Sequence, residues 1–314
     1  MKAFLCGFGA YLPERVVTNQ EIAARIGRSA EWIETASGIQ QRRWASVETS
    51  VADLAVAAGQ DCLAKTFPQQ NGAETIGLVI VASGSAPAGF PGPAAEVAER
   101  LGCGSGAAID LPMASAGSLF GMAMAARMTE AHGNVLVIGV EKMSAVLRAA
   151  ATPDPNTEIL FGDGAGAVLI SAKPMQRSWR ILDTALHSDG SFRGHLYFRE
   201  GILKMDGLSV ILQASRKLPA VIQEVLSRQN IAAKDVTAFL MHQANQNLLT
   251  RVAKTLGVAE STFYSNISRY GNTSSASMLI AASEWASSTN VNGPVVFAAF
   301  GAGFHWGALV ACQE

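Results

Sequence analysis

Largely apolar runs recur along the chain and alternate with stretches in which apolar residues return at helical spacing. The runs are typical of strands covered on both faces, and they lie at 76–82, 135–140, 163–170, 236–241, 295–300 and 306–312. Helical spacing and capping residues predict helices over 29–37, 50–65, 94–102 and 209–228. Strands that alternate with helices in this way predict an α/β protein.

The order of these elements repeats along the chain with a period of about 160 residues. The strand predicted at 76–82 corresponds to 236–241, and the pair at 135–140 and 163–170 corresponds to 295–300 and 306–312. Such a repeat predicts two similar α/β halves around a pseudo-twofold axis, which we place at 1–172 and 173–314. Loops and helix starts from both halves would then meet at one shared cleft.

A serine stands where a short strand gives way to a buried helix. The strand at 109–111 stops at Pro112, and an Ala-, Met- and Leu-rich run follows without charge up to Arg127. Ser115 lies at the predicted start of this helix, where backbone N–H groups and the helix dipole suit a nucleophile or an oxyanion. An ordinary serine N-cap is the alternative interpretation of the same position.

Two polar residues of the second half are predicted to face the same cleft. His242 follows the strand at 236–241, and Asn272 precedes a small-residue helix that ends near residue 287. Alone, His242 is also explained as a structural or surface residue, and Asn272 as an N-cap. Together with Ser115, they predict a nucleophile, a base and an orienting group.

Composition and charge limit the classes of partner, compartment and cofactor that the sequence suggests. The chain has 314 residues, of which 49% are hydrophobic and 16% charged, and this balance suits a large buried core. A net charge of −1 favours neither nucleic acid nor an anionic membrane as a partner. We expect a cytoplasmic protein, because the sequence shows no signal peptide or transmembrane segment and its four cysteines suit reduced thiols. No CxxC or other metal-ligand spacing occurs, so no metal site is expected.

Several short motifs follow one another in order over nearly the whole chain. They are Gly-Ala-Tyr-Leu-Pro-Glu at 9–14, Glu-Trp-Ile at 31–33, Phe-Gly-Asp-Gly-Ala-Gly-Ala at 161–167, His-Gln-Ala-Asn at 242–245, Tyr-Gly-Asn-Thr-Ser at 270–274 and Gly-Phe-His-Trp-Gly at 303–307. Taken together, the chain resembles the β-ketoacyl-acyl carrier protein synthase III family of thiolase-like condensing enzymes. The resemblance implies a thiolase-like α/β fold, with two pseudo-symmetric halves in a five-layered αβαβα arrangement.

The resemblance also implies an acyltransferase of fatty acid or polyketide biosynthesis. In this family a cysteine is acylated from an acyl-CoA, and a His and an Asn promote decarboxylation of a malonyl carrier thioester. The resulting carbanion attacks the acyl-enzyme. His242 and Asn272 correspond to the family's His and Asn, whereas Ser115 stands at the position of the cysteine. The N–H groups of Ser115 and Ala302 would hold the oxyanion, if the backbone at Ala302, usually a glycine, tolerates a Cβ.

Serine in place of cysteine leaves the reaction open. A thiol ionises readily at a helix N-terminus, whereas a hydroxyl needs a base, and His242 is the candidate. Ser115 fits a natural variant that condenses, or one that only transfers starter acyl groups in polyketide assembly. It also fits a cysteine replaced by serine to trap a ligand, and a non-catalytic partner subunit. The retained His242 and Asn272 argue against the last of these.

The family substrate is a CoA or phosphopantetheine thioester, and no tightly bound cofactor is implied. The residues that would bind it are Trp32, Gly207 and Asn245. Ala36 and Leu208 stand where the family commonly has Arg and Asn. These departures favour a donor bound to an acyl carrier protein, or an unusual acyl-CoA. Arg251 and Lys254 could meet an acidic carrier protein, a solvated basic face being the alternative.

The acyl pocket is expected to involve aromatic and apolar side chains from three separate segments. By resemblance they are Phe90, Met113 and Phe304. Phe90 resembles the residue that reaches across the twofold axis into the partner's pocket. A homodimer is therefore expected.

Overall fold

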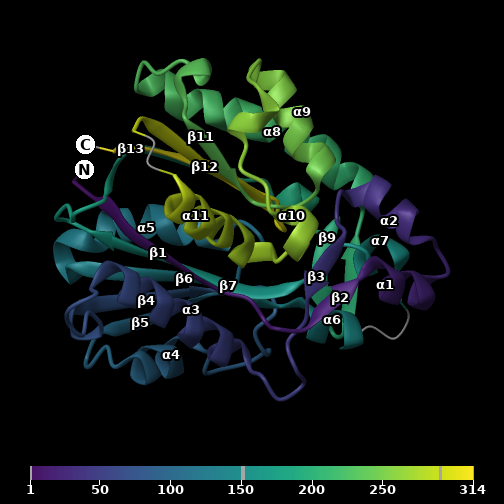
Figure 1. Cartoon of the computed structure of the whole chain (residues 1–314), viewed down its shortest axis with the longest axis horizontal. Coiled ribbons are helices and arrows are strands. Elements are labelled where there is room, and N and C mark those ends of the chain that lie inside the picture. Colours follow the sequence, from purple (N-terminus) through teal and green to yellow (C-terminus); the bar gives the residue numbers. More distant parts are fainter. Residues whose placement is uncertain (1, 150–152, 290–291, 314) are drawn as a thin grey trace.

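The computed structural model describes residues 2–149, 153–289 and 292–313, and within these ranges nine strands form one mixed sheet (Figure 1). Their spatial order is β11 (Ala238–Met241), β12 (Pro294–Gly301), β13 (His305–Gln313), β8 (Trp179–Ser188), β1 (Phe4–Tyr11), β7 (Asp163–Ser171), β6 (Asn134–Lys142), β4 (Ile76–Ala82) and β5 (Ala107–Leu111). Two small antiparallel pairs lie beside it, β2 (Val16–Thr18) with β3 (Gln41–Arg43) and β9 (Leu196–Arg199) with β10 (Ile202–Met205).

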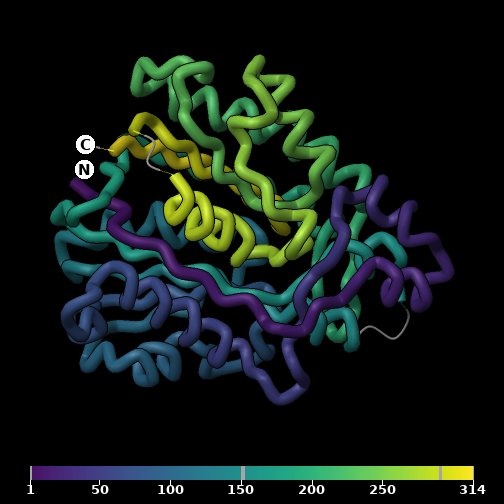
Figure 2. The backbone as a smooth tube through the Cα atoms, in the orientation of Figure 1, coloured from purple at the N-terminus to yellow at the C-terminus, as the bar shows by residue number. Residues whose placement is uncertain are grey.

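The two halves of the large sheet repeat one topology. In the first half β4 runs parallel to β6, β6 antiparallel to β7, and β7 antiparallel to β1. In the second half β11, β12, β13 and β8 follow the same sequence of directions. Only a short antiparallel pairing joins β1 to β8, so β1 passes along the junction of the halves (Figure 2). The division at residues 172 and 173 stays a prediction, and it falls between β7 and β8.

Helices complete the predicted αβαβα layers. α5 (Gly117–His132) and α11 (Ser277–Ser288) pack between the two halves of the sheet (Figure 1). α3 (Val51–Thr66) and α4 (Ala94–Leu101) cover the outer face of the first half, and α8 (Gly207–Arg228) with α9 (Gln246–Leu256) covers that of the second. The central layer is the main apolar core, with side chains from both helices and both halves buried together. The thiolase-like arrangement expected from the sequence is thus confirmed.

The remaining helices are short. They are α1 (Asn19–Ile26), α2 (Ala30–Ser37), α6 (Met143–Ala149), α7 (Pro155–Glu158) and α10 (Ile267–Tyr270). Side-chain caps define several helix starts, including Ser29 for α2 and a reciprocal capping box between Ser50 and Asp53 for α3. Among the described residues, no helix combines the length and apolar character needed to cross a bilayer.

Some elements differ from the sequence prediction. The proline and aspartate residues over 152–157 predict a loop, but this stretch contains α7. Its residue 152 lies outside the described residues. The apolar pattern did not predict β8, nor the β9 and β10 pair. Both strands of that pair are partly exposed and mix charged with apolar residues, so they lack the continuous apolar runs of the buried strands.

The central layer depends on a close approach between α11 and β7. A Cβ added at Gly166 of β7 would lie 2.6 Å from the Cβ of Leu279 and 2.7 Å from the backbone nitrogen of Ile280. The helix backbone therefore rests directly on the strand at this point, and only glycine leaves the space. This contact sets the distance between α11 and the sheet, and so also the position of the turn that precedes α11.

We predict that Gly166→Ala lowers the free energy of unfolding by about 1–3 kcal/mol, because the added methyl overpacks a rigid backbone contact. Thermal unfolding followed by circular dichroism measures the change. Gly190→Ala is the matched control, since a Cβ at Gly190 meets no atom within 4 Å. Equal melting temperatures for Gly166→Ala and the unsubstituted protein would contradict the prediction, because they would show that α11 can move away from β7 without a loss of stability.

Candidate active site

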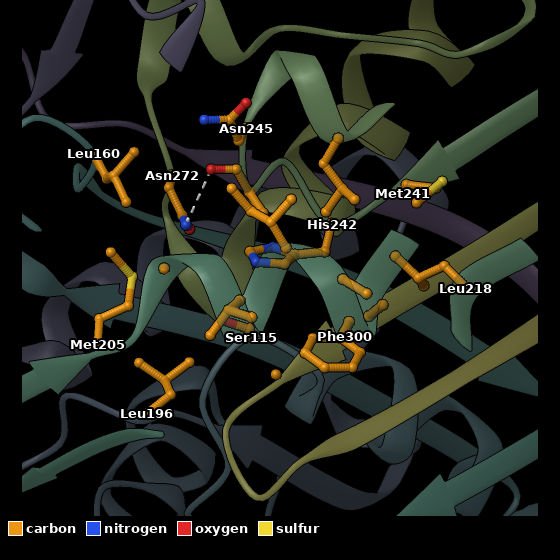
Figure 3. A pocket seen from close by; sticks show the side chains of 18 of the residues that line it. Ser115, Leu160, Leu196, Met205, Leu218, Met241, His242, Asn245, Asn272 and Phe300 are labelled. Atoms are coloured by element: carbon orange, nitrogen blue, oxygen red, sulfur yellow. Dashed lines mark hydrogen bonds between the residues drawn. The ribbon is translucent and has the colours of Figure 1, made fainter. Parts of the chain in front are cut away.

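One cavity brings together half of the predicted site residues (Figure 3). It is lined by Ser115, Leu160, Phe161, Leu196, Met205, Gly207, Val210, Ile211, Ala214, Leu218, Met241, His242, Ala244, Asn245, Leu248, Asn272, Ala299, Phe300 and Gly301. None of these residues carries a formal charge when the histidine is neutral. The cavity therefore suits an uncharged, largely apolar ligand that carries a few polar groups.

Ser115 occupies a sharp turn ahead of the central helix. α5 begins at Gly117 with Ala116 as its N-cap, so the alternative interpretation of Ser115 as an N-cap is wrong. Its φ is 64°, a left-handed conformation that is uncommon for a serine and that tight turns and functional sites retain. Gly301 permits this turn, because a Cβ there would lie 2.8 Å from the backbone nitrogen of Ala116. The turn places a mostly buried hydroxyl at the cavity wall.

The nearest polar partner of Ser115 comes from the other half of the chain. The N–H of Ser115 donates to Oγ of Ser274 at 2.9 Å, and the two Oγ atoms lie 3.4 Å apart. This is the N–H that the sequence prediction assigned to an oxyanion, so an oxyanion would have to share it with Ser274 or displace the Ser274 hydroxyl. Ala302 follows Gly301 in the turn between β12 and β13, and its φ is not positive. Its backbone therefore accommodates a Cβ.

His242 directly follows β11 and is buried. Its Nδ1 lies 2.6 Å from Oγ of Ser277 in the first turn of α11, and the same Oγ accepts the N–H of Gln243. Burial lowers the pKa of His242 from 6.5 to about 4, because the low-dielectric surroundings disfavour the imidazolium. The ring is therefore neutral near pH 7, and with Nδ1 held by Ser277 its Nε2 is the nitrogen left for a ligand.

Asn272 is held by its own backbone and by the turn that follows it. Its N–H donates to the carbonyl of Leu160, and its carbonyl accepts the N–H of Gly162. Its Oδ1 accepts the N–H of Ser274 at 2.8 Å, which orients the amide group. Its Nδ2 has only a long contact of 3.5 Å, to the carbonyl of Ala244. The amide therefore keeps donor capacity beside His242 (Figure 3).

Two of the three residues predicted to bind the thioester substrate also line the cavity. Gly207 begins α8, and Asn245 caps α9 while its Nδ2 donates to the carbonyl of Ala36 in α2. Trp32 lies on α2 as well but is not part of the cavity wall; it is half-buried, with the guanidinium of Arg28 5.3 Å from its ring centroid. α2 and α9 are thus tied together beside the cavity.

The structure does not bring the three predicted acyl-pocket residues to this cavity. Phe90 is 98% exposed on the loop between β4 and α4. Met113 packs against the central core, and Phe304 is fully buried and stacks on Phe192 with a centroid separation of 5.1 Å. Phe300 lines the cavity instead, and its ring lies 4.8 Å from that of Phe304. The role of the three residues in acyl binding stays a prediction.

Sequence reasoning also missed residues that support the predicted ones. Ser274 and Ser277 contact Ser115 and His242, and both lie in the small-residue stretch that follows Asn272. Their density of hydroxyls was the available signal, but it could not show which side chains face inward. Among the described residues, no group of three or more His, Cys, Asp or Glu side chains is arranged to hold a metal ion. The site offers neutral hydrogen-bond donors and a hydroxyl within apolar walls.

Comparisons with known proteins agree with this arrangement. The family model for 3-oxoacyl-[acyl-carrier-protein (ACP)] synthase III matches residues 109–190. The model for the C-terminal part of the same family matches residues 226–312. The β-ketoacyl-[acyl-carrier-protein] synthase III of Geobacillus kaustophilus is 34% identical over 313 residues, which is 98% of each chain. The Staphylococcus aureus (strain Newman) protein of the same name is 32% identical over 315 residues, again 98% of each chain.

Solved structures show the same likeness. The 3-oxoacyl-[acyl-carrier-protein] synthase III of Aquifex aeolicus superimposes with a TM-score of 0.91 at 31% identity, over 99% of each chain. The priming β-ketosynthase of the R1128 polyketide pathway superimposes with a TM-score of 0.87 at 29% identity, over 99% of this chain and 96% of its own. From these matches, which span nearly its full length, the chain belongs to the β-ketoacyl-acyl carrier protein synthase III family of condensing acyltransferases.

Proposed function

We propose that this chain carries an acyl group on Ser115 and joins it to a malonyl thioester in a decarboxylative condensation. The observation that supports the proposal most is the meeting of Ser115, His242 and Asn272 at one uncharged cavity. The mostly apolar walls suit the acyl chain and the pantetheine arm of an acyl-CoA or an acyl carrier protein. The reaction would supply a 3-oxoacyl thioester to fatty acid or polyketide biosynthesis.

In the first half-reaction Oγ of Ser115 attacks the carbonyl carbon of the donor thioester. The new C–O bond forms as the C–S bond breaks, and the hydroxyl proton passes through His242 to the departing thiolate. A neutral imidazole can accept this proton, and burial keeps His242 neutral. The N–H groups of Ser115 and Ala302 are the proposed donors to the oxyanion, with Ser274 releasing the former.

In the second half-reaction His242 and Asn272 bind the thioester carbonyl of the malonyl group. Cleavage of its C–C bond releases CO₂ and leaves an enolate, whose oxygen two neutral N–H donors stabilise. The enolate carbon then attacks the ester carbonyl on Ser115, a C–C bond forms as the C–O bond breaks, and the serine oxygen takes a proton from solvent water. The hydroxyl of Ser277 supports both steps because it can accept from or donate to Nδ1, and so pairs with either tautomer of His242.

A starter-unit acyltransferase that performs no condensation is the second candidate. The favouring observation is the nucleophile itself, because an ester on Ser115 can be passed directly to the thiol of a carrier protein. Leu208, 86% exposed beside Gly207, also departs from the Asn that the family commonly has there. In this reaction Ser115 and His242 keep their roles, whereas Asn272 would have no enolate to stabilise.

We further propose that the protein acts as a cytoplasmic homodimer. Phe90 supports the dimer, because a large aromatic side chain that is 98% exposed is more stable when a partner covers it. Three cysteines support a reducing compartment, because Cys6, Cys62 and Cys103 are buried thiols that form no disulfide. Arg251 and Lys254 are exposed on α9, which Asn245 caps, and would face an acidic carrier protein.

We predict that Asn272→Asp separates the two half-reactions. The carboxylate still accepts the N–H of Ser274 but lacks the amide donor, so condensation should fall by about 10²–10³-fold. Acylation of Ser115 should continue, because that step does not use the amide. Intact-protein mass spectrometry follows the acyl-enzyme, and chromatography follows the 3-oxoacyl product. An unsubstituted protein that is acylated yet makes no 3-oxoacyl product would contradict condensation and support the starter-unit acyltransferase.

We predict that the condensation rate shows no inflection near pH 6.5 and declines only toward the lowered pKa of His242, about 4. Rates at saturating substrate between about pH 8 and pH 5 test this. Because the folded pKa lies below that of the unfolded chain, the unfolded chain binds more protons in this window. Stability therefore decreases as the pH falls from about 6.5, and circular dichroism at each pH is the control. An inflection at 6.5 in folded protein would contradict a buried, neutral His242.

A further inference from the structure

A buried carboxylate, Glu141, lies close to the turn that carries Ser115 and forms no ion pair with the residues that the structure describes. Glu141 is near the end of β6 and is 0% exposed, and none of the ion pairs found among the described residues includes it. Its oxygens accept hydrogen bonds instead, from the N–H groups of Gly84 and Ser275 and from the hydroxyls of Ser83 and Ser85. Donors from two separate segments thus converge on one side chain.

Both of these segments contact the turn between β5 and α5 that carries Ser115. Oγ of Ser275 donates to the carbonyl of Met113 at 2.8 Å. Gly84 packs against Ala114 so closely that a Cβ on the glycine would lie 2.9 Å from the Cα of Ala114. Glu141 therefore connects the loop after β4 with the turn before α11. Met113 and Ala114, which precede Ser115, contact these two segments.

The turn held by Glu141 also connects the proposed nucleophile to Asn272. Ser274 accepts the N–H of Ser115 and donates its own N–H to Oδ1 of Asn272. Ser115 and Ser274 both have positive φ, at 64° and 46°. Serines hold such conformations only where their surroundings over-determine them. The N–H of Ser275, the next residue, is fixed by Glu141 at 3.2 Å.

We infer that Glu141 is a positioning residue that sets the placement of Ser115 and Asn272 through the turn at 274–276 and the loop at 83–85. A carboxylate suits this task because it accepts several hydrogen bonds at once and binds N–H groups more strongly than a neutral acceptor does. Glu141 does not line the cavity, so it acts on the reaction only through its neighbours. The inference rests on the proposed roles of Ser115 and Asn272.

Glu141→Gln tests the inference with the smallest change of shape. The glutamine amide has one oxygen that accepts hydrogen bonds, where the carboxylate has two. Its NH₂ group would face N–H and O–H groups that donate to the carboxylate in the unsubstituted protein. We expect the single-turnover acylation rate of Ser115 to fall by about 10-fold or more, since displacement by about 1 Å can cost 10²-fold. The donor concentration at half-maximal rate should stay within about twofold, because the cavity wall is unchanged.

Asp163→Asn is the matched control. Asp163 is also 0% exposed and accepts from the N–H groups of Ala45 and Ser144 and from the Ser144 hydroxyl, away from the Ser115 segment. It should lose thermal stability as Glu141→Gln does, yet keep its acylation rate within about twofold. An acylation rate in Glu141→Gln equal to that of the unsubstituted protein would overturn the inference. An equal loss in both variants would overturn it too, as a general effect of destabilisation.

A readout independent of acyl transfer separates this inference from the proposed function. In a Ser115→Cys background, alkylation of the new thiol by iodoacetamide reports the placement of position 115 directly, and adding Glu141→Gln should slow it several-fold. Cys6, Cys62 and Cys103 are buried, and mass mapping identifies the modified residue. If no donor acylates the unsubstituted protein, the proposed function fails while a slowed alkylation still supports the inference. Should Glu141→Gln not fold, Ser275→Ala, which removes the bond to Met113, should change alkylation in the same direction.

Discussion

One hydrogen bond between the two halves of the chain sets the geometry of the active site. Ser115 arrives from the first half and Ser274 from the second, and the bond between them holds two strained serines against one another. The rest of the structure keeps these turns in register: α11 rests on β7 at Gly166, and Glu141 anchors both flanking segments. The nucleophile position is thus defined by long-range contacts and not by a helix terminus alone.

The chemistry of a serine at this position differs from that of the family's cysteine in one respect. A thiol needs little help to ionise, whereas a hydroxyl must lose its proton during the attack. Here the candidate base is a histidine that burial keeps neutral, and the cavity adds no charged side chain that would change its pKa. Neutral His242 and Asn272 can also stabilise an enolate, so His242 is proposed to act in both half-reactions and Asn272 in the second.

Much of the fold could be predicted from the sequence, because buried strands and capped helices are local patterns. The apolar run at 76–82 coincides with β4, and Ser29 and Ser50 cap the helices that they were expected to start. Less of the candidate site could be predicted from the sequence. Phe300 lies in β12 and Phe304 in the turn that follows it, and only the folded chain shows that the first lines the cavity. Ser274 likewise contributes to the site through its hydrogen bond with Ser115, which is 159 positions away in the sequence.

The central claim is that Ser115 carries the acyl group that the condensation uses. Its most direct test is the intact mass of the protein after incubation with a series of acyl-CoAs and acyl carrier proteins, followed by a chase with malonyl carrier. The account predicts an acyl adduct that maps to Ser115, is absent from Ser115→Ala, and disappears during the chase as a 3-oxoacyl thioester forms. An adduct that persists on Ser115→Ala, or no adduct with any donor, would contradict it.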